Sequence, residues 1–251
     1  MLSEVKSMTL IGIDGKLVNV QVDISSGLPS WDVVGLPDIS IKESKQRVRT
    51  ALKNISYDLP SRKITINLAP ADIKKEGSFF DLPISLGILA DMNIISTESF
   101  SNYIFIGELS LNGDINKING VLPMCIEAKN LGIKKVIIPF ENRFEASIVN
   151  DLEVYPAKNL LDVIAHLQEE KTIERYNFEL EKYFSNIDNL EQNFSSVKGQ
   201  KKVKRALEIA AAGGHNCLLI GSPGSGKTLL SKCIPSILPD LNFDESLEIT
   251  K

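Results

Sequence analysis

Apolar and polar positions follow two different periods along residues 1–168. Alternation with a period near two predicts strands, and apolar positions three and four apart predict helices. We expect strands at residues 5–13, 16–24, 31–35, 64–68, 103–106, 135–139 and 153–156, and helices at 38–54, 82–92, 122–131, 142–148 and 160–168. Asp14-Gly15 and Asn112-Gly113 are turn signals for two hairpins, over 5–24 and 107–118. Hairpins mixed with crossover helices predict one α/β domain over residues 1–168.

The pattern changes after residue 168. Residues 169–195 are polar and rich in Glu, Asn and Tyr, which is typical of a linker or of an irregular packed arm. Periodicity then returns, with a helix expected over 201–212, a buried type of strand over 215–220 and a helix over 228–237. A last short helix is expected with Asp244 as its N-cap. Residues 196–251 therefore read as the start of a second domain.

Composition and charge narrow the class of protein. The chain is 43% hydrophobic with a net charge of −4, so no global charge signal for nucleic acid is present. Cys125, Cys217 and Cys233 lie in apolar stretches without C-x-x-C pairing, which predicts buried, reduced thiols in a cytoplasmic protein. No signal-peptide pattern and no apolar run of about 18 residues is present, so no membrane partner is expected.

A glycine-rich run carries the strongest chemical signal. It fits G-x-x-x-x-G-K-[ST] and follows a predicted strand and opens a predicted helix, as a phosphate-binding loop requires. Its residues are Gly221, Ser222, Pro223, Gly224, Ser225, Gly226, Lys227 and Thr228. Lys227 would bridge the β- and γ-phosphates of ATP, and the Thr228 hydroxyl would ligate Mg²⁺. The alternative is an ordinary glycine-rich turn before a helix.

The sequence after this loop does not provide the second half of an ATPase site. Hydrolysis needs an acidic residue at the end of another apolar strand, and only residues 229–251 follow Thr228. Asp244-Glu245 lacks a preceding four-residue apolar run, and Asp244 suits a helix cap better. We therefore expect the phosphate cradle without the hydrolytic half, so that the chain binds nucleotide weakly at best and does not turn it over.

Several stretches together resemble the magnesium-chelatase-like AAA+ ATPases of the ComM/YifB type. They are Val34-Gly35-Leu36-Pro37-Asp38, Lys42-Glu43-Ser44, Arg47-Val48-Arg49, Asn67-Leu68-Ala69-Pro70-Ala71-Asp72, Lys74-Lys75-Glu76-Gly77-Ser78, Phe80-Asp81-Leu82-Pro83, Gly107-Glu108-Leu109, Val197-Lys198-Gly199-Gln200, Gly213-Gly214-His215-Asn216 and the phosphate loop. The resemblance implies a Lon-protease-like (ribosomal S5 domain 2-like) domain over 1–168, a linker over 169–195 and the start of a P-loop AAA+ domain over 196–251. It also implies assembly into a ring and work on DNA, in recombination or natural transformation.

A Ser-Lys peptidase is the rival that this resemblance raises. Aligned with the D-G-P-S-A-G and G-G-L-K stretches of Lon proteases, the chain has Phe79 at the serine and Leu122 at the lysine. Neither side chain can attack a carbonyl or accept a proton, so no catalytic residue and no peptidase activity are expected. Ser78 and Lys117 lie close to these positions in sequence and leave a rescued dyad open. A non-enzymatic, partner-binding module also stays open, as does a chelatase subunit that inserts Mg²⁺ into a porphyrin.

A few polar residues remain to be assigned. Basic residues on the 38–54 helix, together with Lys74-Lys75, are candidates for DNA phosphate contacts, or else for a solvated face or for ion pairs with Glu43 or Asp38. Those on the helix are Lys42, Lys45, Arg47, Arg49 and Lys53. His166 is expected to be a packed histidine, and His215 to line the nucleotide side or to cap the preceding helix. Two histidines so placed predict no metal site.

Overall fold

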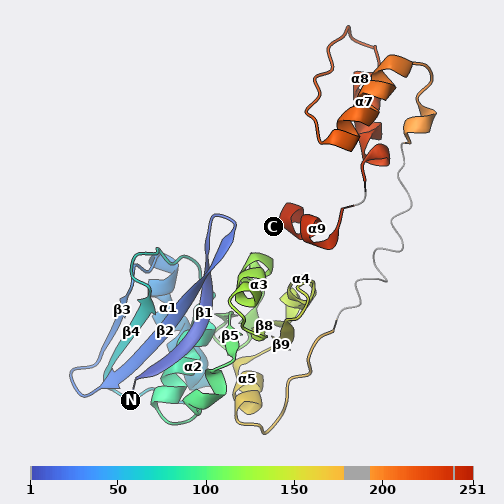
Figure 1. Cartoon of the computed structure of the whole chain (residues 1–251). Helices are drawn as coiled ribbons and strands as arrows, with labels where there is room; N and C mark the ends of the chain where they lie inside the picture. Colours follow the sequence, from blue (N-terminus) through green and yellow to red (C-terminus); the bar gives the residue numbers. More distant parts are fainter. Residues whose placement is uncertain (1, 178–192, 240, 251) are drawn as a thin grey trace. The chain divides into compact units, whose positions relative to one another are not determined.

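The computed structural model of the chain describes residues 2–177, 193–239 and 241–250 (Figure 1). The chain divides into two compact units, Met1–Phe178 and Glu179–Lys251. The first unit mixes hairpins, parallel strands and helices, which confirms the predicted α/β class. Within the described part of the chain, no helix is long and apolar enough to cross a membrane.

A four-stranded sheet forms one part of the first unit, in the order β1-β2-β4-β3. Its strands are β1 (Ser3–Ile11), β2 (Asp14–Ser25), β3 (Ser30–Val34) and β4 (Lys63–Ala69). The β1–β2 hairpin turns at residues 12–13, since Ile11 pairs with Asp14, so the predicted turn at Asp14-Gly15 is wrong. Gly12, at φ +62°, supplies the left-handed backbone. Gly15 is required by close packing instead, because a Cβ there would lie 2.8 Å from the Pro123 carbonyl oxygen.

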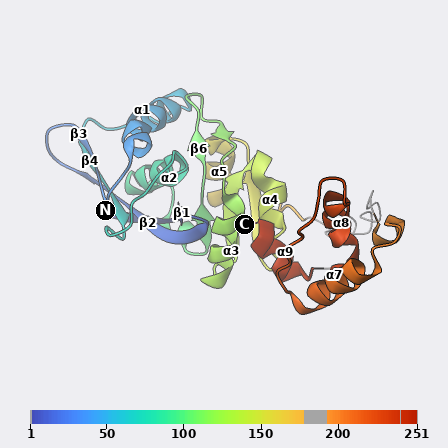
Figure 2. The same cartoon turned by 90° about the horizontal axis from the view of Figure 1, so that it is seen from above.

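Two helices pack beside this sheet. Helix α1 (Ile39–Asn54) connects β3 to its parallel neighbour β4 and begins at the expected cap, where Asp38 Oδ1 accepts the Ile41 N–H at 2.8 Å. Helix α2 (Asp81–Asp91) packs on β1, β2 and α1, and every one of its residues is buried. Figure 2 shows α1 and α2 on the same side of the sheet. An all-apolar pattern predicted this burial.

A second, parallel sheet completes the unit, in the order β5-β8-β9. The remaining elements of the unit are β5 (Tyr103–Phe105), the β6 (Glu108–Leu109) and β7 (Ile115–Asn116) hairpin, α3 (Val121–Asn130), β8 (Lys135–Pro139), α4 (Arg143–Ser147), β9 (Glu153–Ala157) and α5 (Leu160–Leu167), with short 3-10 turns η1 (Thr97–Phe100) and η2 (Phe140–Asn142). The two sheets are tied by Ser7, whose Oγ on β1 donates to the Phe105 carbonyl at 2.8 Å. The Asn112-Gly113 hairpin turn is confirmed.

Residues 169–177 pack against the rest of the first unit. The Tyr176 N–H donates to the Val154 carbonyl on β9 at 2.9 Å, and the Ile173 N–H donates to His166 Nδ1 at 3.1 Å. Of the two interpretations of this polar stretch, the irregular packed arm therefore describes residues 169–177. Residues 178–192 of the expected linker lie outside the described residues.

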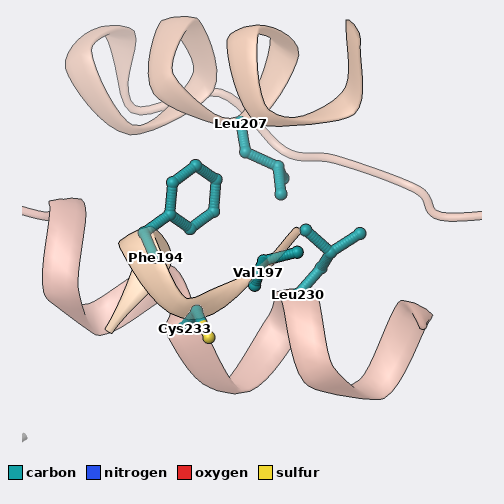
Figure 3. Close-up of a cluster of buried hydrophobic side chains, with 5 residues drawn as sticks. All are labelled: Phe194, Val197, Leu207, Leu230 and Cys233. Carbon is teal, nitrogen blue, oxygen red and sulfur yellow. The ribbon is translucent and has the colours of Figure 1, made fainter. Parts of the chain in front are cut away.

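The second unit is built from short helices around a small core. Its elements are η3 (Phe194–Ser196), α7 (Lys201–Gly213), α8 (Lys227–Cys233), η4 (Ile234–Ile237) and α9 (Phe243–Thr250). Figure 3 shows the buried side chains Phe194, Val197, Leu207, Leu230 and Cys233 turned toward one another. The helix expected over 228–237 changes to a 3-10 turn near its end, because Pro235 has no N–H for the backbone ladder.

The strand expected at 215–220 is not formed. A buried parallel strand needs neighbours, and residues 193–239 and 241–250 contain no other strand. Leu218 and Ile220 are 83% and 87% exposed, whereas Leu219 packs against the small core. Cys217 is exposed for the same reason, so the expectation of three buried thiols is wrong at this position.

The last helix begins at a different cap from the one predicted. Asn242 Oδ1 accepts the Glu245 N–H at 2.9 Å, and the Glu245 carboxylate accepts the Asn242 N–H at 2.8 Å. This reciprocal pair is a capping box, which satisfies two of the free N–H groups at a helix start. The helix itself was predicted correctly, but Asn242 takes the place that we assigned to Asp244.

Candidate nucleotide-binding site

The glycine-rich loop connects the 215–220 segment to α8. Gly224 and Gly226 have φ values of +78° and +83°, and no atom lies within 4 Å of the position that a Cβ would occupy at either residue. The loop therefore needs glycine for its backbone conformation and has open space beside it at both positions. A phosphate group requires this kind of access to the backbone.

The Lys227 ammonium lies against the loop that precedes it. Its Nζ donates to the carbonyl oxygens of Gly221 at 2.7 Å and Ser222 at 2.8 Å, and it lies 3.2 Å from Ser225 Oγ. Three oxygen atoms of one short loop therefore surround a single positive charge. Phosphate oxygens are stronger acceptors for an ammonium than neutral carbonyls are, since the bond is then charged on both sides.

Thr228 follows at the start of α8. Its side chain is exposed, and its hydroxyl makes no hydrogen bond with any residue that the structure describes. Thr228 and Lys227 line a groove of about 420 Å³, within the size range of small-molecule sites. The remaining lining residues are Leu207, Cys217, Leu219, Ser231 and Ile234. A free hydroxyl beside the lysine fits the role of a Mg²⁺ ligand.

The positions that correspond to a peptidase dyad hold packed apolar side chains. Phe79 is 9% exposed and Leu122 is 4% exposed. Ser78 donates its hydroxyl to the Glu108 carboxylate. Lys117 is exposed and, among the described residues, pairs with no acid. The Ser78 hydroxyl is thus bonded to an acid, while the lysine proposed for a rescued dyad lies at the surface.

A buried ion pair beside this region was missed from the sequence. Arg47 on α1 contacts the carboxylate of Asp81, the first residue of α2, through Nε at 2.6 Å and a second guanidinium nitrogen at 3.1 Å. The Asp81 side chain is fully buried and that of Arg47 is 21% exposed. Burial raises the pKa of Asp81 to about 6, although Arg47 and the Leu109 N–H both oppose that shift. The sequence signal was a charged residue inside the apolar run from 79 to 84.

Three of the seven basic candidates for DNA contacts are committed to other partners. Arg47 pairs with Asp81 rather than with Glu43 or Asp38. Lys74 forms an exposed ion pair with Glu76 at 2.5 Å. Lys75 is fully buried and donates to the Pro70 carbonyl, and burial lowers its pKa. The expectation of a phosphate contact is therefore wrong for Lys75 and for Arg47.

Both histidines have structural roles. His166 is half-buried, its Nε2 lies 3.1 Å from the Tyr103 hydroxyl, and desolvation lowers its pKa. The backbone N–H of His215 donates to the Ala210 carbonyl at 2.9 Å and so caps α7. Within the residues that the structure describes, no group of His, Cys, Asp or Glu side chains could hold a metal ion.

Comparison with known proteins covers both units. A family model described as "Subunit ChlI of Mg-chelatase" matches residues 20–142, and one described as "Magnesium chelatase, subunit ChlI" matches residues 193–251. The protein YifB of Escherichia coli is 40% identical over 98% of this chain. The competence protein ComM of Haemophilus influenzae is 38% identical over the same share. The chain belongs to the magnesium-chelatase-like ComM/YifB family.

The relatives are longer than this chain, and some of them are proteases. This ComM/YifB-type chain spans 48% of the length of both YifB and ComM. Lon protease 2 of Bacillus subtilis is 26% identical over 66% of this chain, which supports the Lon-like character of the α/β unit.

Proposed function

We propose that this chain binds ATP with Mg²⁺ at residues 221–228, as the phosphate-binding part of an AAA+ ATPase. The observation that carries the proposal is the Lys227 ammonium, which already lies over the loop between three oxygen acceptors. The Thr228 hydroxyl beside it is free among the described residues. A cation, a free hydroxyl and two glycines with open backbone form a coherent set for a bound triphosphate.

Four residues of the loop have tasks in this proposal. Lys227, which donates to the Gly221 and Ser222 carbonyls, would instead donate to phosphate oxygens and would neutralise charge on the phosphates. Gly224 and Gly226 let the backbone approach the phosphates closely. Thr228 ligates Mg²⁺, which when bound would screen the remaining phosphate charge. In this proposal the loop would bind and position ATP.

The wider role is proposed from the family. We propose that the chain works in the cytoplasm as part of a ring ATPase that acts on DNA, and that residues 1–251 bind ATP without turning it over. Support comes from the name of ComM, a competence protein, and from the acids Asp244 and Glu245 of this chain, which lie at the start of helix α9 and not at the end of a strand. The Lon-like unit would then serve the assembly without peptidase chemistry.

Nucleotide specificity tests the proposed cradle. Isothermal titration of AMP, ADP and ATP into the full chain, each with Mg²⁺, compares ligands that differ only in the number of phosphates. A loop that holds β- and γ-phosphates should bind ATP and ADP at least about tenfold more tightly than AMP, a difference of about 1.4 kcal/mol. Equal binding of all three would show recognition of the nucleoside instead and would contradict the proposal.

A second candidate function has its own observation. Phe79 and Leu122 fill the positions of a peptidase dyad with buried apolar side chains, so the Lon-like unit can be a binding module rather than an enzyme. If that unit only binds a partner, then nucleotide should have no effect on it. Hydrogen exchange of residues 2–177 with and without ATP separates the two candidate functions. In a ring ATPase, nucleotide binding at residues 221–228 is expected to change exchange in the Lon-like unit.

A further inference from the structure

Four of the basic residues on α1 fall on one side of the helix. Residues in an α-helix are about 100° apart, so this set occupies an arc of about 80°, and Arg47 lies on the opposite half, where it reaches Asp81. We call the set the basic stripe: Lys42, Lys45, Arg49 and Lys53. Among the described residues none of the four forms an ion pair or a side-chain hydrogen bond. The stripe is therefore free to bind an external anion.

Two members of the stripe line a cleft with a third cation. Lys45 and Arg49 lie in it together with Arg62, which precedes β4, and with Trp31 of β3. Arg62 also has no ion pair or side-chain hydrogen bond within the described ranges. The cleft measures about 80 Å³, so it admits a single anionic group and not a whole nucleoside, whose sites are several times larger. Three positive charges thus line a small volume without a counter-ion.

Trp31, which lines the cleft, also carries an unsatisfied neutral donor. The Trp31 indole Nε1 is buried and has no hydrogen-bond partner in the part of the chain that the structure describes. A buried donor without an acceptor is unfavourable, and so are like charges four residues apart on a helix, as Lys45 and Arg49 are. A ligand with several acceptor oxygens and a negative charge would neutralise the cations of the cleft. A phosphate group has these properties.

The length of the stripe indicates a polymer. Lys42 and Lys53 lie eleven positions apart, which is about 16 Å along the helix. A single phosphate cannot reach both ends, but a nucleic-acid strand carries a phosphate at each nucleotide. We propose that the basic cleft and stripe bind the phosphate backbone of a nucleic-acid strand, with one phosphate in the cleft and its neighbours on Lys42 and Lys53. This deepens the DNA part of the proposed function and is independent of the nucleotide loop.

Binding of this kind has three measurable properties. It should be insensitive to base sequence, since the cleft is too small to read a base, and it should weaken steeply with salt. Each phosphate contact to a single strand adds about 0.7 to the slope of log affinity against log salt. Trp31 is the only tryptophan in the sequence, so a phosphate in the cleft should also change the intrinsic fluorescence.

The test uses the full chain and a labelled single-stranded DNA 30-mer, followed by fluorescence anisotropy at several salt concentrations. The double variant Lys45→Ala, Arg62→Ala removes two cations from the cleft. The matched control Lys16→Ala, Lys117→Ala removes two exposed cations that lie outside it and pair with no described acid. We expect the cleft variant to bind at least about tenfold more weakly at low salt, with a slope lower by about 0.7 because one phosphate contact is lost, and the control to bind like wild type.

Contrary outcomes would overturn the inference in distinguishable ways. If wild type, cleft variant and control bind DNA alike, the cleft is not the site, although the DNA role stands. If wild type binds no DNA at low salt, the inference fails and the nucleotide proposal is untouched. If poly-glutamate or anionic phospholipid vesicles bind as tightly as DNA and change Trp31 fluorescence equally, the ligand is a general polyanion or a membrane. The fluorescence of wild type needs no variant and so does not depend on variant folding.

Discussion

Arg47 and Asp81 join the two main helices of the Lon-like unit through a contact of 2.6 Å between Nε and Oδ2. The carboxylate also accepts the Leu109 N–H at 3.3 Å, so the same group fixes the start of the β6–β7 hairpin. One buried acid therefore orients α1, α2 and the hairpin relative to one another. This arrangement explains why Arg47 points away from the basic stripe.

Replacement of the arginine should destabilise the unit. Arg47→Met leaves the Asp81 carboxylate buried without its cation, which typically costs about 3–5 kcal/mol for a buried pair. We expect about 3 kcal/mol at pH 8, since the guanidinium is partly exposed. Urea unfolding followed by Trp31 fluorescence reports on this unit. The control Arg49→Met should change stability by less than about 0.5 kcal/mol, and equal losses in both variants would contradict the role of the pair.

The pKa of Asp81 predicts a pH dependence. Folding raises this pKa from its ordinary value of 3.8 to about 6, so the folded state holds the proton more tightly than the unfolded state does. Stability from this group is therefore largest at low pH and falls as pH rises from about 4 to about 6, by an amount on the order of 3 kcal/mol. Asp81→Asn lacks this titration. The stability of wild type relative to the Asn variant should fall across this range, and a flat or rising difference would refute the assignment.

Peptidase activity should be absent. Phe79 and Leu122 cannot supply a nucleophile or a base, and the Ser78 hydroxyl is bonded to Glu108. Incubation of the full chain with an unfolded, fluorescently labelled protein should release no peptides, with or without ATP. Cleavage that disappears in Ser78→Ala would instead establish a rescued dyad.

Because residues 215–220 do not form a strand, replacement of two neighbouring leucines should change the stability of the second unit to different extents. Leu219 packs on the small core and Leu218 is 83% exposed. Leu219→Ala should destabilise the second unit by about 1–2 kcal/mol, and Leu218→Ala should have almost no effect. Hydrogen exchange of α7 backbone amides measures both. A loss of protection in Leu218→Ala equal to that in Leu219→Ala would mean that the segment is packed as a strand.

Local patterns predicted most of the elements, and contacts between distant residues decided the rest. The Asp38 cap, the buried α2 and the Asn112-Gly113 turn follow from signals a few residues long. The turn of the first hairpin was misplaced because Gly12 and Gly15 look alike in sequence, while the Pro123 carbonyl that requires Gly15 is distant. The strand at 215–220 failed because its apolar pattern presupposes neighbouring strands that residues 193–239 and 241–250 do not contain.

The candidate sites also differ in how far local sequence predicts their residues. Loop residues 221–228 could be predicted as a phosphate site from spacing alone, because the glycines, the lysine and the threonine of such a loop lie within eight consecutive positions. The basic cleft was found only in part. Lys45 and Arg49 were candidates as members of a basic helix, whereas Trp31 and Arg62 join them through the sheet. Arg47 and Lys75 looked equivalent to them in sequence and turned out to be structural.

Lys227 is expected to hold the phosphates of ATP. Isothermal titration of ATP with Mg²⁺ into the full chain should be compared for wild type, Lys227→Ala and the control Lys232→Ala, which removes an exposed lysine from the same helix. Loss of the ammonium should weaken binding at least about tenfold in Lys227→Ala, because its charge-assisted bonds to phosphate are lost, and Lys232→Ala should bind like wild type. Equal affinities in all three proteins, or no binding by wild type, would contradict the account.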